Sequence, residues 1–128
     1  MRICIFSDIH GNNIAFKEFA EHVYERYDAY IFAGDIYGYY YEIDEVLNYL
    51  EKFRDLYAVL GNHDKNYLEK KDSLERKSFF SEKYGKSYEI NSEKFFQWTN
   101  NKTPFLEVNI DSLKIAIVHG TLDDPLNG

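Results

Sequence analysis

The sequence predicts one α/β domain, residues 1–128, in which strands and helices alternate along the first half of the chain. Short apolar runs recur at residues 2–7, 29–33 and 56–60, and each is long enough for a buried strand. Between them, apolar residues recur every three or four positions, which is the period of an amphipathic helix. Elements in this βαβαβ order form a parallel sheet with right-handed crossovers.

The apolar positions of the two intervening segments indicate where each helix begins. The first helix is expected to start after Asn12 or Asn13, either of which is a natural N-cap. The second is expected to start near Ile43. The inward-facing residues are Phe16, Phe19, Ala20, Val23, Tyr24 and Tyr27 in the first helix, and Ile43, Val46, Leu47, Leu50 and Phe53 in the second.

The second half of the chain predicts further helices and a hairpin. Residues 66–86 are charged and rich in lysine, which indicates a solvated helix, and Ser92 is expected to cap another helix that ends near residue 100. Strands at 105–110 and 113–119 flank Asp111 and Ser112, which suit a tight turn. Leu74, Phe79, Phe80, Phe95, Phe96 and Trp98 are candidates for the core; the aromatic residues among them could equally form an exposed patch.

The composition disfavours several classes of protein. A formal net charge of −7 argues against a basic surface that wraps nucleic acid. No apolar run approaches the roughly 20 residues that a membrane-spanning helix needs. The single cysteine, Cys4, lies in an apolar run and indicates a core residue in a reducing cytoplasm. We therefore expect a cytoplasmic protein without a membrane or nucleic-acid partner.

Metal-ligating residue types stand where four of the expected strands end. Because the carboxyl ends of parallel strands share one edge of a sheet, these side chains are expected to converge there. Carboxylate, imidazole and amide groups suit Mn²⁺, Fe²⁺ or Zn²⁺. The residues occur as Asp8-Ile9-His10, Gly34-Asp35, Gly61-Asn62-His63-Asp64 and His119-Gly120.

This ordered series of motifs resembles the calcineurin-like metallophosphoesterase superfamily. The resemblance runs over essentially the whole chain, and residues 119–126 look like a loop of its small bacterial and archaeal phosphodiesterase-like branch. It implies an α/β sandwich with two divalent metal ions at its rim, Mn²⁺ first, with Fe, Zn, Ni or Mg as alternatives. It also implies a set of ligands: Asp8 and His10 for the first metal, Asp35 for both, and Asn62 and His119 for the second.

The resemblance further implies a hydrolase of phosphoric mono- or diesters with a small, nucleotide-like substrate. A metal-activated hydroxide would attack phosphorus. His63 would be the proton donor, and Asp64 would steady it.

The chain departs from the family pattern at its C-terminal end. The family continues with another strand and a Gly-His-x-His segment that supplies one histidine to each metal, whereas this sequence stops at Gly128. We therefore expect a truncated domain with an incomplete second sheet, doubtful occupancy of the second metal site, and strands left open to self-association as a homo-oligomer. The alternative is a truncated or degenerate module with weakened metal binding and a binding or interaction role.

Two further segments have more than one interpretation. The tyrosine-rich loop could pack over the following helix, or Tyr37, Tyr39 or Tyr40 could stack on an aromatic part of the substrate. The lysines of residues 66–86 could form a solvated helix face, or they could steer a phosphate substrate.

Overall fold

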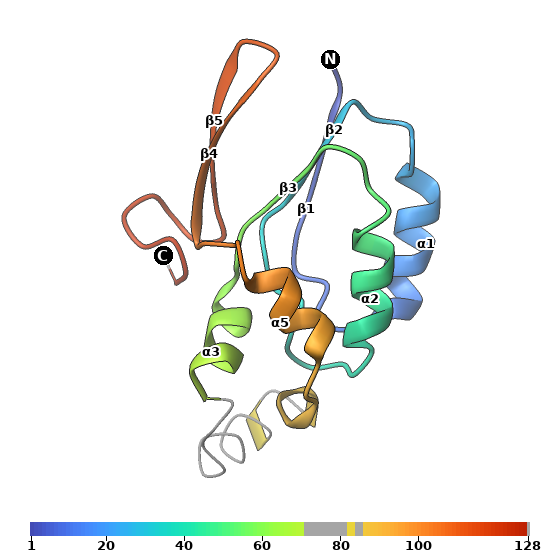
Figure 1. Ribbon diagram of the computed structural model, residues 1–128, viewed down its shortest axis with the longest axis vertical. Helices are drawn as coiled ribbons and strands as arrows, with labels where there is room; N and C mark the ends of the chain where they lie inside the picture. The colour runs from blue at the N-terminus through green and yellow to red at the C-terminus, as the bar shows by residue number, and fades with distance from the viewer. Residues whose placement is uncertain (71–81, 84–85, 128) are drawn as a thin grey trace.

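The computed structural model describes residues 1–70, 82–83 and 86–127, and it confirms the α/β class. Strands β1 (Ile3–Phe6), β2 (Ala29–Phe32) and β3 (Leu56–Ala58) form a parallel sheet in the order β1-β2-β3. Cys4 pairs with Tyr30, and Tyr30 pairs with Leu56. Helices α1 (Asn13–Val23) and α2 (Ile43–Leu50) connect the strands and cover one face of the sheet (Figure 1).

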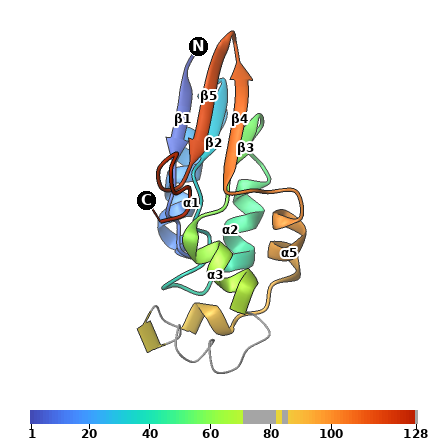
Figure 2. The same ribbon diagram turned by 90° about the vertical axis from the view of Figure 1, so that its left-hand side faces the viewer.

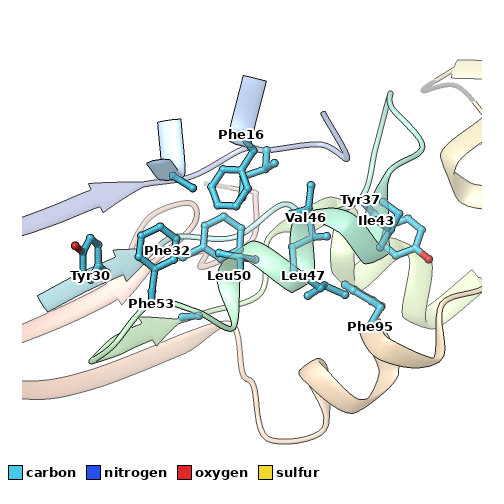
Figure 3. Packing of buried hydrophobic residues seen from close by; sticks show 14 of the residues in the cluster. Phe16, Tyr30, Phe32, Tyr37, Ile43, Val46, Leu47, Leu50, Phe53 and Phe95 are labelled. Carbon is cyan, nitrogen blue, oxygen red and sulfur yellow. The ribbon is translucent and has the colours of Figure 1, made fainter. Parts of the chain in front are cut away.

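The main core lies between the sheet and these two helices. The predicted helix faces supply it, because Phe16, Val46 and Leu50 are all buried against strand residues. Figure 3 shows Phe16, Phe32 and Leu50 gathered in this layer. The first helix is shorter than predicted: it ends at Val23, and the chain turns away at Glu25, whose φ is 61°. Asn12 caps it, accepting a hydrogen bond from the N–H of Ala15.

The predicted hairpin packs on the opposite face of the sheet. Strands β4 (Phe105–Ile110) and β5 (Leu113–Val118) pair in antiparallel fashion and lie in front of the parallel sheet in Figure 2. Ile110 and Ile117 join Ile31 and its neighbours in a second apolar cluster. Asp111 and Ser112 both have positive φ, 49° and 72°, which matches the two-residue turn expected there. The second sheet has two strands among the described residues.

The region after the third strand differs from the sequence prediction. Helix α3 (Asn62–Lys70) starts inside the Gly61–Asp64 motif rather than at residue 66, and it buries Tyr67. It is followed in the described chain by a short 3₁₀ helix, η1 (Lys86–Glu89), and by α5 (Glu93–Thr99). The predictions for Leu74, Phe79 and Phe80 fall outside the described residues.

The predicted cap and core residues of α5 are confirmed. The Ser92 hydroxyl accepts a hydrogen bond from the N–H of Phe95 at 3.0 Å. Phe95 is fully buried, and Phe96 and Trp98 pack against the same core rather than forming an exposed patch. Throughout the described part of the chain, each helix is too short or too polar to span a membrane.

Candidate metal centre

The loops that follow β1 and β2 are joined by backbone hydrogen bonds at the carboxyl edge of the sheet. The N–H of Asp8 donates to the carbonyl of Gly34 at 2.8 Å, and the N–H groups of Ile9 and His10 donate to the carbonyl of Asp35 at 2.9 and 3.1 Å. These bonds hold the Asp8–His10 and Gly34–Asp35 motifs side by side, so the convergence expected from parallel strands is observed.

Asp35 stands at the middle of the candidate centre. Its side chain is buried, and its Oδ2 atom lies 3.2 Å from Nε2 of His119 and 3.8 Å from Nε2 of His10. Asp8 Oδ1 lies 3.4 Å from the same His10 nitrogen. Two groups of possible ligands share Asp35: one adds Asp8 and His119, and the other adds His10 and His63. Within each group the ligand atoms lie within 4.8 Å of one another.

Backbone carbonyls orient two of the imidazole rings. Nδ1 of His10 lies 2.7 Å from the carbonyl oxygen of Tyr37, and Nδ1 of His119 lies 2.8 Å from that of Ala33. A carbonyl oxygen can only accept, so each Nδ1 carries the hydrogen and each Nε2, which faces Asp35, is left for a metal ion. This arrangement fits a divalent cation held by carboxylates and imidazoles.

Without a metal ion, Asp35 and His119 form an ion pair. The hydrogen bond to Asp35 raises the pKa of His119 to about 9, although burial opposes the shift. A metal ion therefore has to displace a proton from His119 in order to bind there.

The backbone is strained where the candidate ligands lie. Asp8, His10 and Asp35 have φ values of 60°, 52° and 75°, in the left-handed region that side chains other than glycine rarely occupy. Each costs about 1–2 kcal/mol relative to a right-handed conformation. Such strain is characteristic of sites where side-chain direction matters for function.

The Asp64 side chain links the loop that begins at Asp35 to Gly61 at the end of the third strand segment. Its buried carboxylate accepts four backbone hydrogen bonds, of 2.8–3.1 Å, from the N–H groups of Asp35, Ile36, Tyr37 and Gly61. Burial and then the neighbouring Asp35 raise the pKa of Asp64 to about 6, while the N–H donors act in the opposite direction. The sequence-based role of Asp64 as the support of the His63 ring stays a prediction.

Gly61 is required by the close approach of Asp35. A Cβ atom at Gly61 would lie 2.0 Å from Oδ1 of Asp35. That oxygen instead accepts a hydrogen bond from the N–H of His63 at 3.0 Å, in the first turn of α3. Asn62 is half-buried at the first position of the helix. Its role as a metal ligand stays a prediction.

His63 is buried beside His10, and their ring centroids are 5.0 Å apart. Burial lowers the pKa of His63, and the negative charge of Asp35 partly offsets this effect. The partner of its Nδ1 atom is the hydroxyl of Tyr88, 2.6 Å away. Sequence reasoning missed Tyr88 because it belongs to none of the motifs and lies 25 residues after His63.

A family comparison settles the relationship that these motifs suggest. The model of the calcineurin-like phosphoesterase family matches residues 1–127. The chain belongs to this family. The centre described above is therefore part of a phosphoesterase-family chain, and its carboxylate and imidazole groups suit divalent metal ions.

Solved structures of similar fold are about twice as long as this chain. A metallophosphoesterase from Sphaerobacter thermophilus is 25% identical, with a TM-score of 0.72 over 98% of this chain and 49% of its own. The hypothetical protein PH1004 from Pyrococcus horikoshii OT3 is 18% identical, with a TM-score of 0.66 over 99% of this chain and 57% of its own. The second likeness shows the fold alone. No curated protein matches the chain significantly.

Proposed function

We propose that the chain is a metal-dependent hydrolase of phosphoric mono- or diesters. The observation that supports this most strongly is the buried Asp35 carboxylate, which has Nε2 of His10 and of His119 within 4 Å and His63 close by. Membership of the phosphoesterase family agrees with this chemistry.

In this proposal the strand-end residues hold two divalent ions, with Mn²⁺ as the first candidate. Asp8 and His10 would bind one ion, Asn62 and His119 would bind the other, and Asp35 would contribute to both. Ions bound there would offset the negative charge of the phosphoryl group and acidify the attacking water. The carbonyl-bound rings of His10 and His119 are already oriented for this task.

His63 is proposed as the proton donor to the leaving group. The ring is shielded from solvent, and its Nδ1 atom is engaged by Tyr88, so we assign donation to the substrate to Nε2. Donation of a proton to the departing alkoxide removes the developing negative charge on its oxygen.

Tyr39 supports a substrate with an aromatic or nucleotide-like part. It is about half-exposed, and its ring lies 5.0 Å from His10 and 5.5 Å from His63. Tyr37, by contrast, is fully buried and cannot stack on a substrate. If Tyr39 contacts the aromatic group, Tyr39→Ala should raise KM for nitrophenyl esters and leave KM for alkyl esters unchanged. The same change in KM for both kinds of ester, or no change for either, would refute the contact.

The function is tested with the purified chain, Mn²⁺ and nitrophenyl phosphate mono- and diesters. We expect hydrolysis that requires metal. Asp35→Asn should abolish metal binding, because it removes the shared charge. His63→Ala should retain the metal and lose about 10²–10⁴-fold in kcat, the usual contribution of a general acid.

His22→Ala is the matched control, because His22 is exposed in the last turn of α1, away from the motifs. It should hydrolyse the esters as the unaltered chain does. Hydrolysis that persists in chelator, or an unchanged rate for both His63→Ala and Asp35→Asn, would contradict the proposal.

The competing proposal is a module without catalytic activity that acts through protein contacts, by itself or as a homo-oligomer. It is favoured by one observation: Asp35 and His119 form an ion pair, so a metal ion has to displace a proton in order to bind there. Under this alternative, elemental analysis should find less than one metal ion per chain, and no ester should be cleaved at saturating Mn²⁺.

A further inference from the structure

The hydroxyl of Tyr88 meets the imidazole of His63 behind the candidate metal centre. Tyr88 lies on η1 and is 1% exposed, and His63 lies on α3 and is 7% exposed. We propose that Tyr88 is a positioning residue that donates its hydroxyl hydrogen to Nδ1 of His63 and thereby holds the neutral ring in the Nε2–H tautomer. The purpose assigned to that tautomer, a hydrogen bond from Nε2–H to the leaving-group oxygen, rests on the proposed function.

The distance between the two side chains indicates which atom donates. Tyr88 Oη and His63 Nδ1 are 2.6 Å apart. Hydrogen bonds from hydroxyl groups are usually 2.7–2.8 Å long, whereas those from N–H groups to oxygen are usually about 2.9–3.0 Å. The contact therefore matches a hydroxyl donor and an unprotonated Nδ1. The His63 carbonyl oxygen also lies near this hydroxyl, but at 3.5 Å it competes weakly for the hydrogen.

Comparison of the three histidines strengthens this assignment. Nδ1 of His10 and of His119 each face a backbone carbonyl, which accepts only, so those rings keep Nε2 for a metal ion. Nδ1 of His63 faces a group that can donate. The group that faces Nδ1 thus distinguishes the three rings. In His10 and His119 it leaves Nε2 without a hydrogen and able to bind a metal ion, whereas in His63 it leaves the hydrogen on Nε2.

This difference matters because the position of His63 would allow it either to bind a metal ion or to donate a hydrogen bond. One of its ring nitrogens lies within 4.8 Å of ligand atoms of His10 and Asp35, so the ring could also bind a metal ion. A neutral imidazole with its hydrogen on Nε2 has no lone pair on that atom to give to a metal. The Tyr88 hydroxyl accordingly reserves Nε2 of His63 for hydrogen donation.

The first test is the tautomer of His63, read from the ¹⁵N shifts of histidine-labelled protein in NMR spectra. The sample is the metal-free chain in chelator, at a pH where the His63 ring is neutral. We expect the unaltered chain to show Nε2–H for His63 and Nδ1–H for a neutral His10. An Nδ1–H tautomer for His63 in the unaltered chain would overturn the proposal, and this arm needs no variant.

Tyr88→Phe removes only the hydroxyl, and Tyr67→Phe is its matched control. Tyr67 is equally buried, at 1% exposed, but its hydroxyl donates to Asn91 instead. Tyr88→Phe should shift His63 toward a mixture of tautomers, and Tyr67→Phe should leave the tautomer unchanged. An unchanged His63 spectrum in Tyr88→Phe would overturn the proposal.

The second test is kinetic and uses the chain loaded with Mn²⁺. Tyr88→Phe should lower kcat about tenfold, with KM and metal affinity within about twofold of the unaltered chain, because only the hydrogen-bond donor to the leaving group is disturbed. In a His63→Ala background the same substitution should change kcat no further, since both act through one group. Equal losses in both backgrounds would exclude action through His63.

The two proposals fail in different ways. If the unaltered chain hydrolyses no ester, the proposed function fails, and the NMR arm still decides whether Tyr88 sets the His63 tautomer. If hydrolysis depends on metal and on His63 but Tyr88→Phe leaves the tautomer and kcat unchanged, the role of Tyr88 fails alone.

Discussion

At the scale of single residues, Asp64 offers a sharp test of what holds the centre together. Its two oxygens accept backbone hydrogen bonds from Asp35, Ile36, Tyr37 and Gly61. Asp64→Asn keeps the shape but replaces one oxygen with an NH₂ group, which would face N–H donors. We expect the free energy of unfolding to fall by about 2–3 kcal/mol, measured by urea denaturation, because buried donors lose their acceptor.

Asp123→Asn makes the same chemical change at an exposed position and should alter the free energy of unfolding by less than about 0.5 kcal/mol. Equal stability of the two variants would show that the Asp64 bonds are replaceable by water or by movement of the loop.

The ion pair between His119 and Asp35 predicts a pH dependence of stability for the metal-free chain. The hydrogen bond to Asp35 raises the pKa of His119 in the fold to about 9, above the ordinary histidine value of 6.5. The folded state therefore binds more protons in this range, and the contribution of the pair is complete below pH 6.5 and lost as pH rises through 9. Urea denaturation in chelator should show this decrease.

His119→Gln should flatten the stability profile between pH 6.5 and 9, because glutamine carries no ionisable proton. If the variant retains the full slope in this range, another group is responsible.

Residue types and their spacing are sufficient to predict which side chains lie close together, but not to describe their contacts. Asp8, His10, Asp35 and His63 converge because parallel strands end at one edge, and His119 joins them from the end of the hairpin strand β5. The hydrogen-bond partners could not be read from the sequence. The carbonyl groups of Tyr37 and Ala33 are backbone atoms that every residue possesses, and Tyr88 reaches His63 through tertiary packing.

At the scale of elements, Ser92 joins two helices. Its hydroxyl accepts from the N–H of Phe95 at the start of α5, and it donates to Asp44 in the first turn of α2 at 2.5 Å. We expect Ser92→Ala to lower the free energy of unfolding by about 1–2 kcal/mol, because a cap and a buried hydrogen bond are lost together. Thermal and urea denaturation would measure this change.

Ser92→Thr retains the hydroxyl and should recover part of the lost stability. A Ser92→Ala variant that unfolds at the same urea concentration as the unaltered chain would show that the cap contributes little.

The sequence predicts helices and strands well where their apolar pattern extends over several residues. It predicts them poorly where a polar motif overlaps the start of a helix. The period of α2 from Ile43 to Leu50 is clear, and so is the hairpin around Asp111 and Ser112. The predicted start of helix α3 near residue 66 is too late because Asn62, His63 and Asp64, in its first turn, lack the apolar period of a helix. Polar residues that serve a site conceal the helix on which they lie.

At the scale of the whole molecule, the candidate centre lies where the two sheets meet. Asp8 and Asp35 follow strands of the parallel sheet, while His119 follows β5 of the hairpin. Binding of Mn²⁺ should therefore raise the melting temperature and slow hydrogen exchange in β4 and β5 as well as in β1 and β2. Hydrogen exchange with mass spectrometry, with and without Mn²⁺, would measure this.

His119→Ala distinguishes the effect of Mn²⁺ on the parallel sheet from its effect on the hairpin in this experiment. It should leave the protection of β1 and β2 by Mn²⁺ largely in place and remove the added protection of the hairpin. If Mn²⁺ still protects β4 and β5 from hydrogen exchange in this variant, a residue other than His119 connects the hairpin to the metal ion.

The bond from His119 to the carbonyl of Ala33 joins residues 86 positions apart in the sequence. A metal ion held by His119 and Asp35 would close a loop of nearly the same length, as a covalent cross-link does. Chain entropy makes such a closure worth about 4 kcal/mol in the idealised case. Loss of such an ion would then loosen the connection between the two sheets, so metal binding would stabilise the fold in addition to any part in the proposed reaction.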